Sequence, residues 1–536
     1  MLLYFLLYKK GVLLPFVCRR GINKQMILDY VILALYALCM VAVAFYTKNR
    51  SGSVDDFLFA GKKGLGGWMT AFAYGTTYFS AVVFIGYAGQ FGKAYGLAAT
   101  WIGIANAIFG ALFAWLVLAK RSKNMSKRLG SKTMPDFFEK RYGSRGLKIF
   151  SAIITFVFLI PYSASVYNGL SSLFEIVFGI PGWIVMICLA ALTALYLFFG
   201  GYFATALSDF VQGIIMIVGV ILMVFFFMSS EQISWDISAI GNTWFTFGKE
   251  GSEGLFGSTV SLISLVLLTS FGVWALPQTI HKYHAVRDKK AITQGIVIST
   301  VFAFLIGFIA YFTGALSYFF PDELSGAPDA QIVPIMLSAV IPVGLTGLIA
   351  VLILSASMST LSSVSLASAS VIAIDLYKGT VKKQADDRQV NIVMRALTLV
   401  FVLISVVLAI LNEKLGIAAI AYMTGISWGT LAGCFIGPYV LGLLWRRVTK
   451  AAVWASMTSS LVLTLSLIVI LGYARADFAC PLDVAIKNGI QSSPLIGVIC
   501  MILSVVITAV ISLFTKAPSD EIIKEAFDKE VEGLVK

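Results

Sequence analysis

Apolar runs of 18 or more residues recur along nearly the whole chain, and they constrain its fold more than any other feature. A helix needs about 20 apolar residues to cross the hydrocarbon core of a bilayer, and a barrel strand needs only about half as many. The 536 residues are 59% hydrophobic and 12% charged, with a mean hydropathy of +0.90. We therefore expect an all-α polytopic membrane protein rather than a soluble protein with a large core.

The apolar runs predict thirteen transmembrane helices, and the basic residues predict their orientation. The predicted helices are centred near residues 37, 78, 107, 162, 190, 217, 268, 305, 357, 402, 431, 462 and 504. Thirty of the 40 lysines and arginines fall at 47–66, 119–148, 281–290, 378–395, 446–450 and 516–536, whereas the intervening loops on the other side carry five. The positive-inside rule then places the N-terminus outside the cell and the C-terminus in the cytoplasm. We expect the helices to lie in the plasma membrane. Topology explains the net charge of +13, so no nucleic-acid partner is expected.

The chain divides into a short N-terminal segment, one transmembrane domain and a short tail. Residues 1–25 place five bases on the side predicted to be outside, and Met26 opens a clean first span. We interpret 1–25 as an upstream mis-start, with a signal peptide as the alternative. Residues 26–515 are the predicted transmembrane domain, and residues 516–536 form a cytoplasmic tail. We expect a functional monomer in the lipid bilayer that is not an enzyme, because no clustered acid, base or nucleophile is evident.

Two polar features lie where the bilayer should be. Five hydroxyl groups occur in the eight residues from Ala356 to Ser363, and Asp209 is the only charged residue between Gly179 and Ser230. Such residues are costly in a membrane and usually mark a transport or proton path. Hydroxyl oxygens and a carboxylate are the ligands that a small hard cation prefers. The sequence therefore predicts a sodium site, with proton coupling through Asp209 as an alternative.

Two predicted spans are interrupted near their centres. Gly75 lies among hydroxyl groups in the second span, and Gly272 and Pro277 interrupt the seventh. Glycines also permit close packing of helices, which is the simpler interpretation of either glycine alone. Paired interruptions five spans apart instead indicate an inverted-repeat transporter with unwound helices at its centre. Unwinding frees carbonyl groups that can coordinate a cation.

Well-separated motifs over residues 30–515 resemble those of the sodium:solute symporters. The resemblance rests on Asp56-Phe-Leu-Phe-Ala-Gly61, Phe79-Ser80-Ala81 through Gly86 and Gly89 to Tyr95-Gly96, Gly200-Gly201-Tyr202 with Asp209-Phe210-Val211-Gln212, Ser359-Thr360-Leu361 with Asp375-Leu376-Tyr377, and Gly437-Pro438-Tyr439 through Gly442 to Trp445. It implies a five-plus-five inverted repeat like that of the leucine transporter, with one preceding helix and two following helices, which makes thirteen. The implied activity is Na⁺-coupled symport of a small organic solute by alternating access.

The resemblance also implies which residues bind the coupling ion, Na⁺. By position, the common sodium site would use backbone carbonyl groups of Thr76, Phe79 and Ala356 with the hydroxyl groups of Ser359 and Thr360. Some members bind a second sodium ion, and the matching residues here are Asp209, Ser359, Ser362 and Ser363. Whether one or two ions bind stays open at this point.

The solute is less constrained than the ion. Aromatic and neutral polar side chains are expected to face a central cavity, without an arginine or lysine to bind a carboxylate. These residues are Tyr78, Tyr162, Asn168, Thr269, Trp274, Gln278, Tyr422, Thr424 and Ser427. We favour an amino acid or a small carboxylate, and a sugar-type solute is the alternative. Proline transporters of the family carry aromatic residues where this chain has Val82, Thr269 and Val273, which disfavours proline.

Other function classes explain the sequence less well. A channel would rarely show paired broken spans, and a transporter-like sensor would need an output domain. His281, Lys282 and His284 are expected in a short cytoplasmic loop, where Lys282 would be a gate or loop charge rather than a ligand. No other grouping of residues suggests a resident cofactor.

Overall fold

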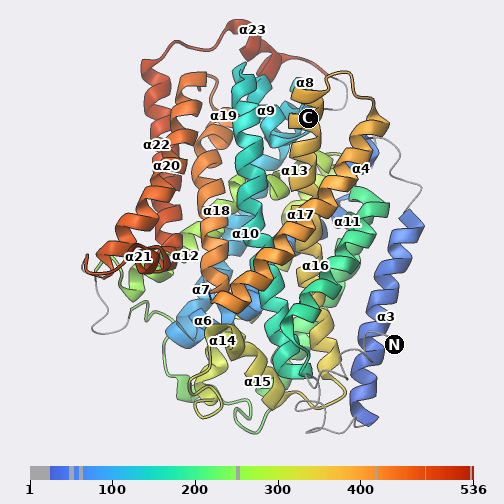
Figure 1. Ribbon diagram of the computed structural model, residues 1–536, viewed down its shortest axis with the longest axis vertical. Helices are drawn as coiled ribbons and strands as arrows, with labels where there is room; N and C mark the ends of the chain where they lie inside the picture. The colour runs from blue at the N-terminus through green and yellow to red at the C-terminus, as the bar shows by residue number, and fades with distance from the viewer. Residues whose placement is uncertain are drawn as a thin grey trace.

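The protein is helical throughout the part of the chain that the computed structural model describes (Figure 1). Those residues are 24–47, 54–59, 64–248, 254–416, 419–476, 478–531 and 534–535. Within them the β-structure is limited to one isolated bridge between Leu65 and Val286. Eleven helical stretches among these described residues are long and apolar enough to cross a membrane. The all-α membrane fold predicted from the sequence is thus confirmed. Most of the predicted N-terminal segment, residues 1–23, lies outside the described residues.

The helices follow one another with short connections. Their bounds are α3 Lys24–Thr47, α4 Val54–Phe59, α5 Gly67–Tyr78, α6 Ala88–Tyr95, α7 Thr100–Ala105, α8 Lys120–Leu129, α9 Met134–Tyr142, α10 Arg145–Phe178, α11 Gly182–Met228, α12 Ser258–Gly272, α13 Pro277–Ala285, α14 Lys289–Ala315, α15 Ile332–Val340, α16 Thr346–Ser370, α17 Asp387–Leu415, α18 Ile420–Ile436, α19 Gly442–Leu444, α20 Lys450–Ala474, α21 Leu482–Gln491, α22 Ser493–Phe514 and α23 Asp520–Ile523. Wider π-helical turns occur at η2 Val82–Tyr87, η4 Asn106–Phe113, η5 Trp115–Ala119, η10 Val371–Val381 and η11 Gly437–Leu441.

Two of the eleven apolar stretches are too long for a single crossing. Helix α11 has 47 residues, which at 1.5 Å per residue is about 70 Å, more than twice the hydrocarbon thickness. It is broken at Gly201, whose backbone has φ 57° and ψ −155°. The stretch Val82–Leu129 is likewise broken at Gly96, with φ 57° and ψ −136°. Only glycine adopts these angles readily, so each stretch changes direction there. The count of thirteen spans and their repeat relationship stay predictions.

The two interruptions predicted from glycine and proline are both present. Helix α5 ends at Tyr78, and Phe79 has extended angles, φ −107° and ψ 115°, before η2 begins at Val82. Helix α12 ends at Gly272, and after one turn of 3₁₀-helix (η7, Val273–Ala275) Leu276 is extended and Pro277 opens α13. Proline suits the first position of a helix because its missing N–H would have no partner there. Each break leaves carbonyl groups without helical partners.

Residues 281–285 correct the sequence prediction, because they are helical rather than part of a loop. They form the end of α13, which packs against α5, α8 and α16. The side chains of Lys282 and Tyr283 are buried there.

Helix α16 lies at the centre of the molecule. It packs against α3, α5, α10, α11, α13 and α17, and residues 355–370 are all buried. The hydroxyl-rich segment therefore faces other helices on every side. Because lipid does not contact it, its polar groups must find partners within the protein.

The basic segments gather at one end of the molecule. Helices α8, α9 and α23 lie together at the top of Figure 1, opposite α15. The C-terminal segment packs back onto this end: Asn124 Nδ2 donates to the Val535 carbonyl group at 3.0 Å, and Arg446 pairs with Asp528 at 2.6 Å. The positive-inside rule predicts that this basic end faces the cytoplasm.

Candidate sodium site and solute cavity

The break after α5 places two carbonyl groups against the hydroxyl groups of α16. Ser359 Oγ lies 3.1 Å from the Thr76 carbonyl oxygen, and Thr360 Oγ1 lies 3.3 Å from the same atom. Thr360 Oγ1 is also 3.4 Å from the Thr77 carbonyl oxygen. Ser359 Oγ is 3.1 Å from the carbonyl oxygen of Ala356 on its own helix. Both side chains are completely buried.

This cluster has the atoms that the sequence predicts for sodium. The Thr76 and Ala356 carbonyl groups and the Ser359 and Thr360 hydroxyl groups come together, and all are neutral oxygen ligands. A hydroxyl group that donates to a carbonyl group can rotate and offer its lone pairs to a cation instead. Phe79 stands at the break, where its N–H donates to the Gly75 carbonyl group at 3.1 Å, and its role as a ligand stays a prediction.

Two of the four residues suggested for a second sodium ion contact a lysine. Lys282 Nζ lies 3.4 Å from Asp209 Oδ2 and donates a hydrogen bond of 2.8 Å to Ser363 Oγ. The Lys282 side chain is 1% exposed and that of Asp209 is 0% exposed. Ser362 Oγ donates to the Ser359 carbonyl group of its own helix at 2.9 Å. Lys282 thus contacts residues of the predicted ion site, contrary to its assignment as a loop charge.

One sequence feature predicts that Lys282 lies on a helix, and the assignment of loops from basic residues did not use it. Pro277 predicts the start of a new helix, and a helix continued from it carries Lys282 more than one turn into the bundle. The sequence prediction placed residues 281–290 in a cytoplasmic loop. Helix α13 instead extends the interrupted span.

A narrow cavity lies beside the break in α5. Four of the nine predicted cavity residues line it: Tyr78, Tyr162, Thr269 and Thr424. The sequence missed the other residues, which are Ser80, Val82, Val83, Tyr87, Asn106, Tyr311 and Trp428. Among these described lining residues there is neither an arginine nor a lysine. The Asn106 side-chain oxygen accepts hydrogen bonds from Thr269 at 2.8 Å and Ser270 at 3.0 Å, so it fixes one wall.

The remaining five predicted cavity residues lie elsewhere. Asn168 Nδ2 donates to the Ala409 carbonyl group at 2.9 Å, and Asn168 Oδ1 accepts from Asn412 at 3.0 Å, which joins α10 to α17. Trp274 Nε1 donates to the Phe109 carbonyl group at 2.8 Å, and the Tyr422 hydroxyl group accepts from Gln90 at 3.0 Å. Ser427 donates to the Phe158 carbonyl group, and Gln278 is buried. Their proposed contact with solute is not supported by this arrangement.

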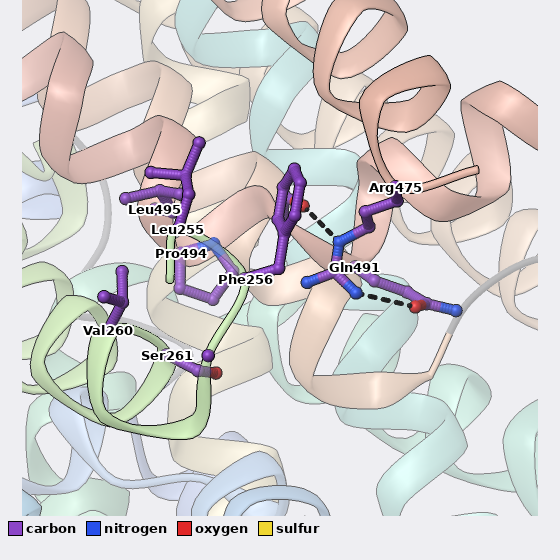
Figure 2. Close-up of a pocket in the computed structure, with 10 residues that line it drawn as sticks. Leu255, Phe256, Val260, Ser261, Arg475, Gln491, Pro494 and Leu495 are labelled. Carbon is purple, nitrogen blue, oxygen red and sulfur yellow. Dashed lines mark hydrogen bonds between the residues drawn. The ribbon is translucent and has the colours of Figure 1, made fainter. Parts of the chain in front are cut away.

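Other pockets lie away from the ion site. A broad vestibule is lined by residues that include Lys93, Tyr95, Thr243, Tyr318 and Pro321, near the loops predicted to be outside. Figure 2 shows a smaller pocket between Phe256 and Arg475. There the Arg475 guanidinium group lies 4.8 Å from the Phe256 ring centroid and donates to Ser492 Oγ at 2.8 Å. Because Arg475 already contacts protein groups, we interpret the residues around this pocket as structural.

The broken helices, the buried oxygen cluster and the adjacent cavity define a class: an ion-coupled membrane transporter. The sodium:solute symporter family model matches residues 57–459. The chain belongs to this family, and it transports a small solute together with Na⁺ as the coupling ion. The recognition made from the sequence motifs is confirmed.

Curated relatives and solved structures agree with the assignment. The chain is 28% identical to the osmoregulated proline transporter OpuE of Bacillus subtilis, over 80% of this chain and 86% of that protein. It is 27% identical to a sodium/proline symporter of Staphylococcus aureus, over 91% and 93% of the two chains. A Na⁺-coupled sialic acid symporter in a substrate-bound, outward-open state has the same fold, with a TM-score of 0.74 at 18% identity over 92% and 98% of the chains.

Proposed function

We propose that the chain carries a small amino acid or carboxylate inward by alternating access, driven by sodium bound between α5 and α16. The observation that carries this proposal is the contact of the Ser359 and Thr360 hydroxyl groups with the Thr76 carbonyl group at the break in α5. The site would be completed by the carbonyl groups of Ala356 and Phe79. An ion there would join a broken helix to the central helix, so its binding would depend on how the two lie relative to each other.

Sodium supplies enough energy for concentrative uptake. One positive charge moving inward gains about 2.3 kcal/mol per 100 mV of membrane potential. A tenfold sodium gradient adds about 1.4 kcal/mol. Together these support a solute gradient of several hundredfold for a single ion. Sodium bound at α5 and α16 would favour the outward-open state, and bound solute would then permit closure.

The cavity favours a small solute with both an apolar and a polar part. Tyr78, Tyr162 and Trp428 provide aromatic walls, while Thr269 and Thr424 provide neutral hydrogen-bonding groups. The Tyr162 hydroxyl group lies near the side chains of Ser80 and Thr360, which supports a solute cavity beside the proposed sodium site. A carboxylate could therefore interact with the bound sodium ion without a basic side chain. The proline-transporting relatives support an amino acid as the solute. Val82 and Thr269 line the cavity at positions where proline transporters of the family carry aromatic residues, so the cavity wall is less aromatic here.

The charge distribution supports a location in the plasma membrane with the basic end in the cytoplasm. The segments with the most lysine and arginine, including α8 and the loops beside it, lie at the end where the C-terminal segment packs. By the positive-inside rule, the same charge distribution supports an N-terminus on the outside. The site is assembled from helices of one chain, which agrees with function as a monomer.

Uptake into proteoliposomes tests the function. Radiolabelled proline, other small amino acids and small carboxylates would be supplied outside, with an inward gradient of sodium, of potassium, or of protons in sodium-free medium. We expect at least one solute to accumulate only with the sodium gradient and to leave when an ionophore collapses it. Accumulation driven by protons alone would instead support the proton-coupled alternative. A sugar added to the same panel tests the alternative solute class.

A further inference from the structure

Two clusters of oxygen atoms lie on the same stretch of α16, and only one has a charged partner from the chain. Ser359 and Thr360 face neutral carbonyl groups of α5. Ser363 instead accepts a hydrogen bond of 2.8 Å from the Lys282 ammonium group, which lies 3.4 Å from Asp209 Oδ2. A positive charge of the protein therefore stands between the carboxylate and a hydroxyl group that the sequence assigns to a second sodium ion.

We propose that Lys282 is a tethered cation, whose ammonium group takes the place of a second sodium ion between α11 and α16. The chain would then bind one sodium ion in each transport cycle. This inference rests on the proposed function, since it presupposes that the cluster at Thr76 holds sodium. It identifies the residue that sets the ion stoichiometry of the site.

Electrostatics favours one cation at this position, not two. Asp209 and Lys282 are both buried, and burial of either charge without the other would be costly. Together they are neutral. A sodium ion added beside the ammonium group would place two positive charges against one carboxylate in a medium of low dielectric constant. The Lys282 ammonium group also lies 5.0 Å from the Tyr202 ring centroid, within cation–π distance.

Ser363 and Thr77 link the tethered cation to the sodium site. Ser363 Oγ, which receives the lysine hydrogen bond, lies 2.8 Å from Thr77 Oγ1. The Thr77 carbonyl oxygen lies 3.4 Å from Thr360 Oγ1 of the sodium site. Lys282 itself is carried by α13, the second half of the interrupted span, which packs against both α5 and α16. Movement of α13 would withdraw the ammonium group, whereas a sodium ion would leave by dissociation.

Counting bound sodium tests the proposal directly. Radioactive sodium would be titrated into the purified full-length chain, and the ions bound per chain would be measured at saturation. We expect one ion in the wild type, one in Lys282→Arg, and none in Ser359→Ala with Thr360→Ala. Lys282→Ala should bind two, because it leaves Asp209 and Ser363 free to receive a sodium ion.

The charge-neutral double variant protects the test against misfolding. Asp209→Asn alone leaves the Lys282 charge buried without its partner, so this variant could fail to fold. Lys282→Met with Asp209→Asn removes both charges and should still bind one ion. Two ions in the wild type, falling to one in the double variant, would overturn the proposal. So would a count of one in a folded Lys282→Ala.

Failure of the underlying function gives a different result. If the wild type binds one ion and Ser359→Ala with Thr360→Ala retains it, the ion is not where the proposed function places it. If the wild type binds none, sodium coupling at this site is refuted. Neither result resembles the gain of an ion in Lys282→Ala, which reports on the tethered cation alone.

Discussion

The cluster at Thr76 and the ion pair of Asp209 with Lys282 lie on either side of Thr77, yet they meet the cost of burial in opposite ways. At Thr76 every group is neutral, and the Ser359 and Thr360 hydroxyl groups satisfy the free carbonyl group when no cation is bound. At Asp209 the buried group is an ionisable carboxylate, and the chain supplies a partner of opposite charge from α13. Ser363 and Thr77 connect the two regions.

In the proposed mechanism, α16 carries one site whose sodium ion exchanges and, beside it, one site whose cation is fixed to the chain. A neutral cluster remains satisfied after its ion departs, because its hydroxyl groups can turn back to the carbonyl groups. A buried carboxylate without a cation must instead take up a proton or remain as an unpaired charge, which is costly. A transporter must release its ion in every cycle, so the neutral cluster is suited to exchange. The lysine suits the position that stays charged.

The largest effect is expected from removing the two hydroxyl groups of the neutral cluster. Ser359→Ala with Thr360→Ala removes both proposed side-chain ligands. The change deletes only a few atoms, and alanine favours a helix at least as strongly as serine or threonine, so α16 should be preserved. We expect sodium-stimulated uptake to be abolished, with normal insertion into the membrane. Uptake in proteoliposomes and the amount of folded protein in the membrane measure the two quantities.

A neighbouring serine provides the matched control for this double variant. Ser357 is buried on the same helix, and its hydroxyl group donates to the Ile353 carbonyl group at 2.7 Å, within the helix itself. Ser357→Ala should retain sodium-stimulated uptake. Full sodium stimulation in the double variant would contradict the assignment of this cluster to sodium.

Next in size is the cost of separating the charged pair. Lys282→Met or Asp209→Asn alone leaves one buried charge without its partner, and we expect each to lose about 3–5 kcal/mol of stability. The double variant should recover most of that loss, because neither charge remains. Thermal unfolding of the four proteins in sodium-free buffer, at a fixed detergent concentration, gives the coupling energy.

This cycle distinguishes a buried pair from a chance proximity. The exposed pair of Lys529 and Glu525 is the comparison, since each side chain is 49% exposed. Its removal should change stability by less than about 1 kcal/mol. Additive losses for Lys282 and Asp209 would show that the two charges do not stabilise each other.

The breaks in the helices were predictable because glycine and proline act locally. Pro277 lacks the backbone donor that a continuous helix requires, and Gly272 precedes it, so the interruption follows from covalent structure. The hydroxyl groups and Asp209 were recognisable because polarity within an apolar run is rare. The helices themselves follow from the length of the apolar runs.

The partners of these groups depend on packing between distant segments, which the sequence does not display. Lys282 meets Asp209 across 73 residues because α13 continues into the bundle after the break. The face that each helix turns inward depends on its neighbours. Asn106 therefore lines the cavity although the sequence did not predict it, and Asn168 instead contacts α17. The wider turns of η2 and η4 also shift that face away from regular helical spacing.

A smaller effect is expected at the cavity beside the neutral cluster. Tyr162 lines the cavity, with its hydroxyl group near Ser80 and Thr360. Tyr162→Phe removes one hydrogen-bonding group and should raise the solute KM about tenfold, which corresponds to about 1.4 kcal/mol. Tyr167→Phe, on the same helix and equally buried but outside the cavity lining, should leave KM unchanged. Equal KM values for the two variants would exclude Tyr162 from solute binding.

The smallest effect is expected at Asn168, which the sequence placed in the cavity and the structure places between α10 and α17. Asn168→Ala removes the hydrogen bonds to the Ala409 carbonyl group and from Asn412, so we expect a loss of about 1 kcal/mol in stability. The solute KM should not change, because the side chain already has protein partners. Unfolding temperature and initial uptake rates measure the two effects. An increase in KM at unchanged stability would return Asn168 to the solute site and show that α10 rotates during transport.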